Sequence, residues 1–148
     1  MRPRTPPPGL VTWLPDFRHN PATMANQPGT AAQLVMRCFH ARTGAHMLHL
    51  QTTSYAEHKA LEEFYLEIVE LTDKFAETYQ GTYSVLDKYP TAGFEIADDA
   101  ETLVNELEQW ITEHRDEIGD DDDTHLQNII DEIVALARST RYKLRTFL

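Results

Sequence analysis

The feature that most constrains the fold is one long amphipathic segment between Ser54 and Gly81 that contains no proline. Ser54 followed three residues later by Glu57 is a capping box, which predicts that a helix begins here. Gln80 and Gly81 predict its end, because glycine readily takes the left-handed conformation that follows a helix. At a rise of about 1.5 Å per residue, this helix is about 40 Å long.

Apolar residues recur along this segment at helical spacing and form one narrow stripe, which predicts the side that faces the core. The stripe consists of Leu61, Phe64, Ile68, Leu71 and Phe75.

Four polar residues lie within roughly 100° of arc on the other side of the helix, roughly 150° from the stripe. His58 and Glu62 are four residues apart, and Asp73 and Glu77 repeat that spacing. The two pairs are about 16 Å apart along the axis, so no single ion can contact both pairs in one chain. Two copies packed antiparallel about a two-fold axis would bring the first pair of one copy opposite the second pair of the other, and such interfaces generate their sites in duplicate.

His46 lies twelve residues before His58, at the end of the preceding predicted helix, and we expect it to fold over the same place. The site would then offer two imidazoles and three carboxylates. This mixture suits iron, zinc or manganese better than calcium, which prefers oxygen ligands alone.

The complete spacing of His46, His58, Glu62, Asp73 and Glu77 resembles the ferroxidase signature of Dps, the ferritin-like DNA-binding proteins from starved cells. The closing segment KLRTFL is also similar to that of the family, and the resemblance covers roughly residues 30–148.

The resemblance implies a ferritin-like four-helix bundle with a long crossover between helices 2 and 3. It implies that two-fold dimers assemble into a hollow shell, a dodecamer in the family. It also implies a ferroxidase, in which the five residues bind iron(II) and peroxide or oxygen oxidises it. Iron storage and protection from oxidative stress in the bacterial cytoplasm would follow.

The sequence departs from the family at two places. Met47 stands where the family usually has a tryptophan beside the first histidine, and no lysine-rich tail is present. A weaker likeness is to small ferritin-like proteins of tailed bacteriophages. It leaves open a non-catalytic role in assembly, with the protein located in a virus particle.

Charge and composition limit the partners. The formal net charge of −11 over 148 residues argues against binding to nucleic acid, which depends on basic side chains, and an acidic surface instead concentrates cations. No apolar run approaches the length needed to span a bilayer. The single cysteine, Cys38, fits a reducing compartment because it has no partner for an internal disulfide.

Residues 1–28 contain seven of the eight prolines and predict a flexible N-terminal arm in front of a domain over residues 29–148. Met24 is a candidate start of translation. An alternative is that the arm docks on a neighbouring copy through Trp13, Leu14 and Phe17.

Three further helices are predicted around the long one. The first runs from Thr30, as N-cap, to Gln51, and its His49 is expected at a surface or interface and not as a ligand. Residues 82–97 form the crossover, with a short helix over residues 83–89. The third helix begins near Asp98 with its own capping box, and the last covers residues 124–147.

Four aspartates precede the last helix. One interpretation is a loop with an acidic N-cap, because aspartate favours a helix N-terminus. The other, which the resemblance supports, is a ring of carboxylates at a pore of the shell that draws iron(II) inward. The candidate pore residues are Asp120, Asp121, Asp122 and Asp123, with His125 as a weaker candidate.

Overall fold

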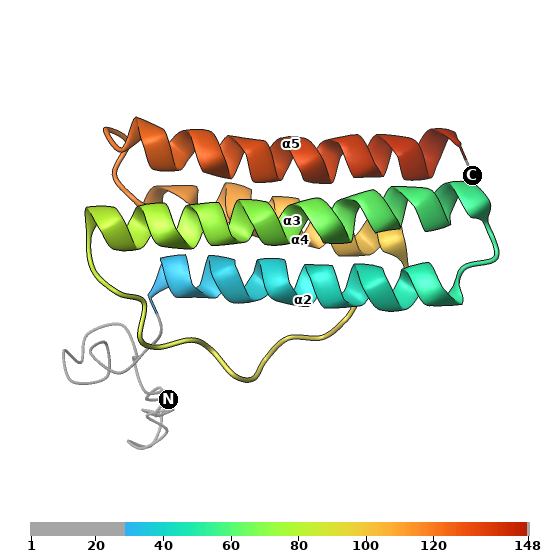
Figure 1. Ribbon diagram of the computed structural model, residues 1–148, viewed down its shortest axis with the longest axis horizontal. Coiled ribbons are helices and arrows are strands. Elements are labelled where there is room, and N and C mark those ends of the chain that lie inside the picture. Colours follow the sequence, from blue (N-terminus) through green and yellow to red (C-terminus); the bar gives the residue numbers. More distant parts are fainter. Residues whose placement is uncertain (1–28, 148) are drawn as a thin grey trace, which may run out of the picture.

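The computed structural model describes residues 29–147, which contain four helices and no strand (Figure 1). The helices are α2 (Thr30–Gln51), α3 (Tyr55–Thr82), α4 (Ala100–Ile118) and α5 (Thr124–Thr146). The predicted all-α four-helix bundle is therefore confirmed. The arm expected over residues 1–28 lies outside the described residues, and so does the final residue of the expected domain. None of the four helices is both long enough and apolar enough to cross a bilayer.

The helices follow an up-down-down-up order (Figure 1). A three-residue turn reverses the chain between α2 and α3, so that these two helices lie antiparallel. The chain between α3 and α4 then returns along the length of the bundle, and α4 runs parallel to α3. Both α2 and α5 pack against α3 and α4. The long crossover predicted between the second and third helices is present.

The predicted stripes form one core at the centre of the bundle. All five stripe residues of α3 are buried, and Phe64, Ile68 and Phe75 are completely inaccessible. The inner sides of α4 and α5 are buried as well, at residues such as Leu107 and Ile130. Cys38 lies in this core, and burial raises the pKa of its thiol to about 12, so the thiol is a poor nucleophile at neutral pH.

Two helix ends differ from prediction. Gly29, not Thr30, occupies the N-cap of α2, and its carbonyl accepts the N–H of Gln33 at 3.0 Å. Helix α3 continues through Gly81 to Thr82, and Gly81 has no positive φ. The helix end keeps its hydrogen bonding, because the Tyr83 N–H donates to the carbonyl of Tyr79.

The crossover contains no helix over residues 83–89, contrary to prediction. Phe94 anchors its second half. The Arg37 guanidinium lies 5.4 Å from the Phe94 ring centroid and 4.6 Å from that of Trp110, and His40 stacks on Phe94 at 4.2 Å. A side chain at Gly44 of α2 would collide with α4, since a Cβ there would lie 2.7 Å from Cδ1 of Leu103. The crossover is thus held by contacts with α2, and not by helix formation.

Helix α4 is capped by Asp99 and not by the Asp98 capping box that we predicted. The Asp99 carboxylate accepts the Thr102 N–H at 2.8 Å and the Thr102 hydroxyl at 2.7 Å. These hydrogen bonds lower the pKa of the Asp99 carboxyl. The sequence offers two adjacent aspartates, and helix geometry selects the second.

Asp99→Ala is expected to lower the free energy of unfolding by about 1 kcal/mol, the typical value of an N-cap, whereas Asp98→Ala changes it by less than about 0.5 kcal/mol. Because the folded state lowers the Asp99 pKa, this contribution is present above the unfolded-state pKa of about 3.9 and is lost as the pH falls through the folded-state value. Urea denaturation of both variants at neutral and acidic pH measures the difference. Equal losses for the two variants would contradict the assignment of the cap.

The basic end of α5 pairs with carboxylates of the same chain. Arg138 and Arg141 contact the buried carboxylate of Glu108 at 2.6 and 2.8 Å. The other two pairs are Lys143 with Glu63 and Arg145 with Glu101.

Candidate metal centre

The turn between α2 and α3 brings two of the predicted ligands to one end of the bundle. Thr52 ends α2 by donating its N–H to the carbonyl of Leu48, and the Ser54 hydroxyl accepts the Glu57 N–H at 3.3 Å. The predicted N-cap of α3 is therefore confirmed. Because the turn is so short, the last residues of α2 lie directly beside the first turns of α3.

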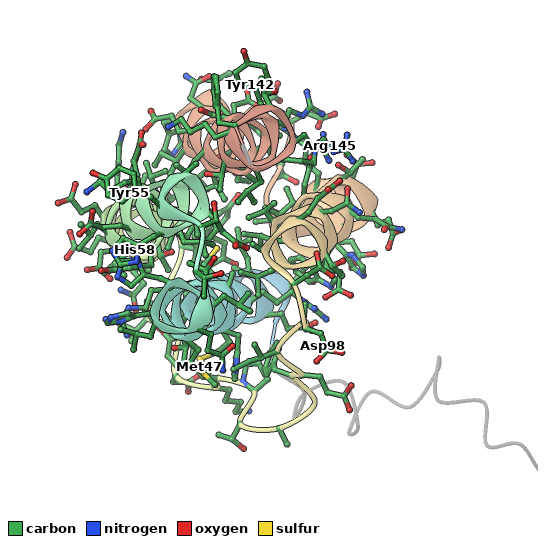
Figure 2. The ribbon with its side chains drawn as sticks, turned by 90° about the vertical axis from the view of Figure 1, so that its right-hand side faces the viewer. Met47, Tyr55, His58, Asp98, Tyr142 and Arg145 are labelled. Carbon is green, nitrogen blue, oxygen red and sulfur yellow. The ribbon has the colours of Figure 1, made fainter. Side chains whose placement is uncertain are left out.

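His58 and His49 form a reciprocal pair across this turn. The Nδ1 of His49 lies 2.9 Å from the His58 carbonyl oxygen, and the Nδ1 of His58 lies 3.1 Å from the His49 carbonyl oxygen. Their rings stack with centroids 3.7 Å apart. In both neutral rings the proton then lies on Nδ1, so the lone pair that binds a metal lies on Nε2. Figure 2 shows His58 at the edge where α2 and α3 meet.

His46 joins the same cluster from α2. Its ring stacks on Tyr65 at 4.2 Å and meets the His49 ring edge-on at 5.9 Å. Tyr65 also makes an edge contact with His49, at 5.2 Å. Three imidazoles and one phenol therefore form a continuous aromatic group on the outer side of the α2–α3 pair.

Glu62 lies one turn after His58, and its carboxylate pairs with Lys59. This hydrogen bond and charge lower the pKa of the Glu62 carboxyl, and the nearby imidazoles of His49 and His58 lower it further. Glu62 is consequently a carboxylate at neutral pH and lies close to both histidines, as an oxygen ligand of the same site would.

Asp73 and Glu77 are exposed on α3, and the nearest members of the two pairs, Glu62 and Asp73, are about 16 Å apart along the helix. Within residues 29–147 no group of three or more histidine, cysteine, aspartate or glutamate side chains is arranged to hold a metal ion. One chain therefore joins His46 and His58 through His49 in one aromatic group and leaves the two distal carboxylates apart from it.

The outer face of α3 between these two halves is partly apolar. Leu66 is 60% exposed and Val69 is half-buried, whereas the stripe residues on the opposite side of α3 are buried. At the histidine end Lys59 is paired with Glu62, whereas the other end carries the two carboxylates of Asp73 and Glu77.

The acidic loop before α5 is largely exposed. Asp123 occupies the N-cap position, as one of our two interpretations had it, but its carboxylate accepts from the Tyr83 hydroxyl and from the Asp120 N–H instead of capping α5. Asp121 and Asp122 are exposed. His125 forms a hydrogen bond of 2.9 Å with the hydroxyl of Thr82. The loop is thus attached to the end of α3.

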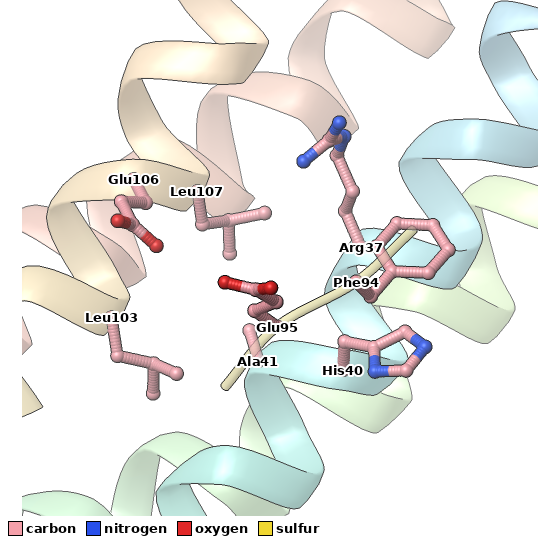
Figure 3. Close-up of a pocket in the computed structure, with 8 residues that line it drawn as sticks. All are labelled: Arg37, His40, Ala41, Phe94, Glu95, Leu103, Glu106 and Leu107. Atoms are coloured by element: carbon pink, nitrogen blue, oxygen red, sulfur yellow. The ribbon is translucent and has the colours of Figure 1, made fainter. Parts of the chain in front are cut away.

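A small hollow lies between α2, α4 and the crossover (Figure 3). Its volume of about 50 Å³ is large enough for water molecules but too small for most substrates. Arg37 lines it beside Glu95 and Glu106; burial lowers the pKa of the Arg37 guanidinium, and the charge of Glu106 partly opposes this. We assign this hollow to the anchoring of the crossover.

Our interpretation of His49 as a surface or interface residue was wrong, since its exposed fraction is 7%. One signal in the sequence would have placed it correctly. His49 follows Ala45 by four residues, and Ala45 lies on the apolar side of the first helix. We had treated histidine as polar and so did not extend the buried side to the helix end.

Comparisons with known proteins reveal relatives without an assigned function. The model of DUF5856, a family of unknown function, matches residues 49–144, which include four of the five predicted ligands but not His46. An uncharacterized 14.6 kDa protein in the mobD-ri intergenic region of Enterobacteria phage T4 is 34% identical over 59 residues. The match covers 40% of this chain and 46% of that relative, so it spans about half the length of the phage protein. No solved structure matches the chain.

Proposed function

For this chain, which belongs to the DUF5856 family of unknown function, we propose oxidation and storage of iron(II) in an oligomeric shell, as in Dps. The metal sites would be shared between two-fold-related subunits. His46, His58 and Glu62 of one subunit would face Asp73 and Glu77 of the next.

The observation that carries this proposal is a common midpoint on α3. In an antiparallel pair of α3 helices, residues opposite one another are equally far from the two-fold axis. His58 and Glu77, Glu62 and Asp73, and Leu66 and Val69 are three pairs that share one midpoint, between residues 67 and 68. A single axis would therefore form two metal sites and bury the exposed apolar residues between them.

Charge supports the same arrangement. The histidine end of the α3 face also carries Lys59, and the other end carries only acidic ligands. Antiparallel pairing would keep Asp73 and Glu77 of the two copies apart and place them opposite the end that carries Lys59, whereas parallel pairing would place the acidic ends together.

The donor set fits iron(II) as a substrate. Neutral imidazoles present Nε2 lone pairs, and the carboxylates compensate the added positive charge when iron(II) becomes iron(III). Two iron(II) ions supply the two electrons that reduce one hydrogen peroxide, with two protons, to two waters. Zinc or manganese would fit the same donors.

The acidic loop would serve this function as an entry path. In a shell, Asp120 to Asp123 would surround a pore and raise the local concentration of iron(II). The net charge of −11 leads us to expect no binding to DNA in a gel-shift at low salt.

Anaerobic titration with iron(II) followed by peroxide tests the proposed function. His58→Ala and Asp73→Ala are each expected to slow the appearance of iron(III) absorbance by at least about 10-fold, because each removes a direct ligand. Glu67→Ala is the matched control, since Glu67 is an exposed acid of α3 outside the arc of the ligands. A double variant of His58 and Asp73 that oxidises iron(II) at the wild-type rate would reject the proposal.

A second candidate is a non-catalytic assembly protein of a bacteriophage particle, which the similarity to the T4 protein favours. Light scattering separates the two candidates. A closed shell supports iron storage in the cytoplasm, and a monomer or small ring supports assembly in a virion.

A further inference from the structure

We propose that His49 is a positioning residue that fixes the ring of His58 so that Nε2 of His58 points out of the bundle. This inference rests on the proposed role of His58 as an iron ligand. His49 does not belong to the set of five ligands, and its own part in the site follows from its contacts.

His49 is the one member of the cluster in ring contact with all three of the others. It stacks on His58 at 3.7 Å and meets His46 and Tyr65 edge-on at 5.9 and 5.2 Å. With 7% of its surface exposed, it forms the inner wall against which the His58 ring lies.

The reciprocal hydrogen bonds fix how the two rings are oriented. His58 donates from Nδ1 to the backbone of His49, and His49 donates from Nδ1 to the backbone of His58. The second bond ties the last turn of α2 to the first turn of α3, and it keeps the two backbones at the separation that the first bond needs. Histidine ligands of metals commonly donate their other ring N–H to a carbonyl in this way, which fixes the tautomer and the ring orientation.

His49 has two separable features, a flat ring and a donor at the Nδ1 position. His49→Phe keeps the ring and removes the donor. His49→Asn keeps an amide donor near the Nδ1 position and removes the ring. His49→Ala removes both. Stacking directly confines the His58 ring, so we expect Phe to preserve more of the His58 geometry than Asn does.

The first measurement needs no metal. Long-range ¹⁵N NMR at about pH 8, above the ordinary histidine pKa of about 6.5, reports which nitrogen of His58 carries the proton. The wild-type protein is expected to show the proton on Nδ1. His49→Ala is expected to shift much of the population to the Nε2–H tautomer, with His49→Phe between the two. An unchanged His58 tautomer in His49→Ala would overturn the proposal.

The second measurement adds iron(II). His49→Ala is expected to weaken the apparent affinity for iron(II) by about 10- to 100-fold, the usual effect of an outer partner of a ligand, with a smaller change in the maximal rate. His49→Phe is expected to recover part of this loss. If instead all three variants lose binding while the His58 tautomer stays as in the wild type, His49 is itself a ligand and the positioning role is wrong.

The two measurements keep this inference separate from the proposed function. A tautomer shift in His49→Ala together with no iron oxidation by the wild type would support positioning and reject the ferroxidase. If His49→Ala fails to fold, as circular dichroism would show, the contrast between His49→Phe and His49→Asn decides in its place.

Discussion

Mixed oligomers of two inactive variants are expected to regain about one quarter of the wild-type rate of iron(II) oxidation. The first variant is His46→Ala with His58→Ala, and the second is Asp73→Ala with Glu77→Ala. Each alone lacks one half of every site. In a mixed dimer, one site combines the two damaged halves and the other combines the two intact halves. Random pairing makes about half of all dimers mixed, and each mixed dimer has one working site of two.

The experiment requires that both variants assemble into the same oligomers. The two variants are therefore co-expressed with different affinity tags, and the oligomers that carry both tags are isolated. The control mixes each variant with a differently tagged copy of itself, which should restore nothing. No recovery in the doubly tagged oligomers would contradict a site shared between subunits. Full recovery would also contradict it, since random pairing cannot repair every site.

The bundle was predictable because burial on a helix follows a simple period. Residues such as Phe64 and Ile68 recur at the spacing of one helix face, and no competing pattern offers another way to bury them. The end of the first helix at Gln51 was predicted, and its beginning was predicted to within one residue. These features depend on neighbours within a few turns, which the sequence displays directly.

The details that were missed depend on residues distant in sequence or on small differences in geometry. Asp99 and not Asp98 caps α4, and the two differ only in where the helix begins. The crossover lacks its expected helix over residues 83–89, and its Phe94 is held by Arg37 and His40 of another helix. His49 is buried by a partner across a turn, His58. Local propensity carries little information about such contacts.

The candidate site was predictable only in part. Periodicity places Glu62 and Asp73 on one outward arc, and the structure brings His46, His49 and His58 together at its beginning. Neither the sequence nor a single chain contains the second helix that would complete the ligand set. Local periodicity therefore reaches the residues of one helix face, and Asp73 and Glu77 would join His58 only across an interface between two copies.

Phe64→Ala is expected to lower the free energy of unfolding by about 3–5 kcal/mol, because it removes a completely buried ring from the centre of the core. Leu66→Ala, two residues along the same helix, should lower it by less than about 0.5 kcal/mol, since Leu66 is 60% exposed in the single chain. Urea denaturation of both variants, at a protein concentration low enough to keep the chain monomeric, measures the contrast.

A third variant, Leu66→Lys, separates folding from assembly. If α3 pairs about an axis between residues 67 and 68, Leu66 contacts Val69 of the second copy, and Leu66→Lys should weaken the dimer while the monomer keeps its stability. Sedimentation at increasing concentration would show this as a shift toward the monomer. A Leu66→Lys protein that assembles like the wild type would place the interface elsewhere, and the carboxylates of Asp73 and Glu77 would then have no histidines opposite them.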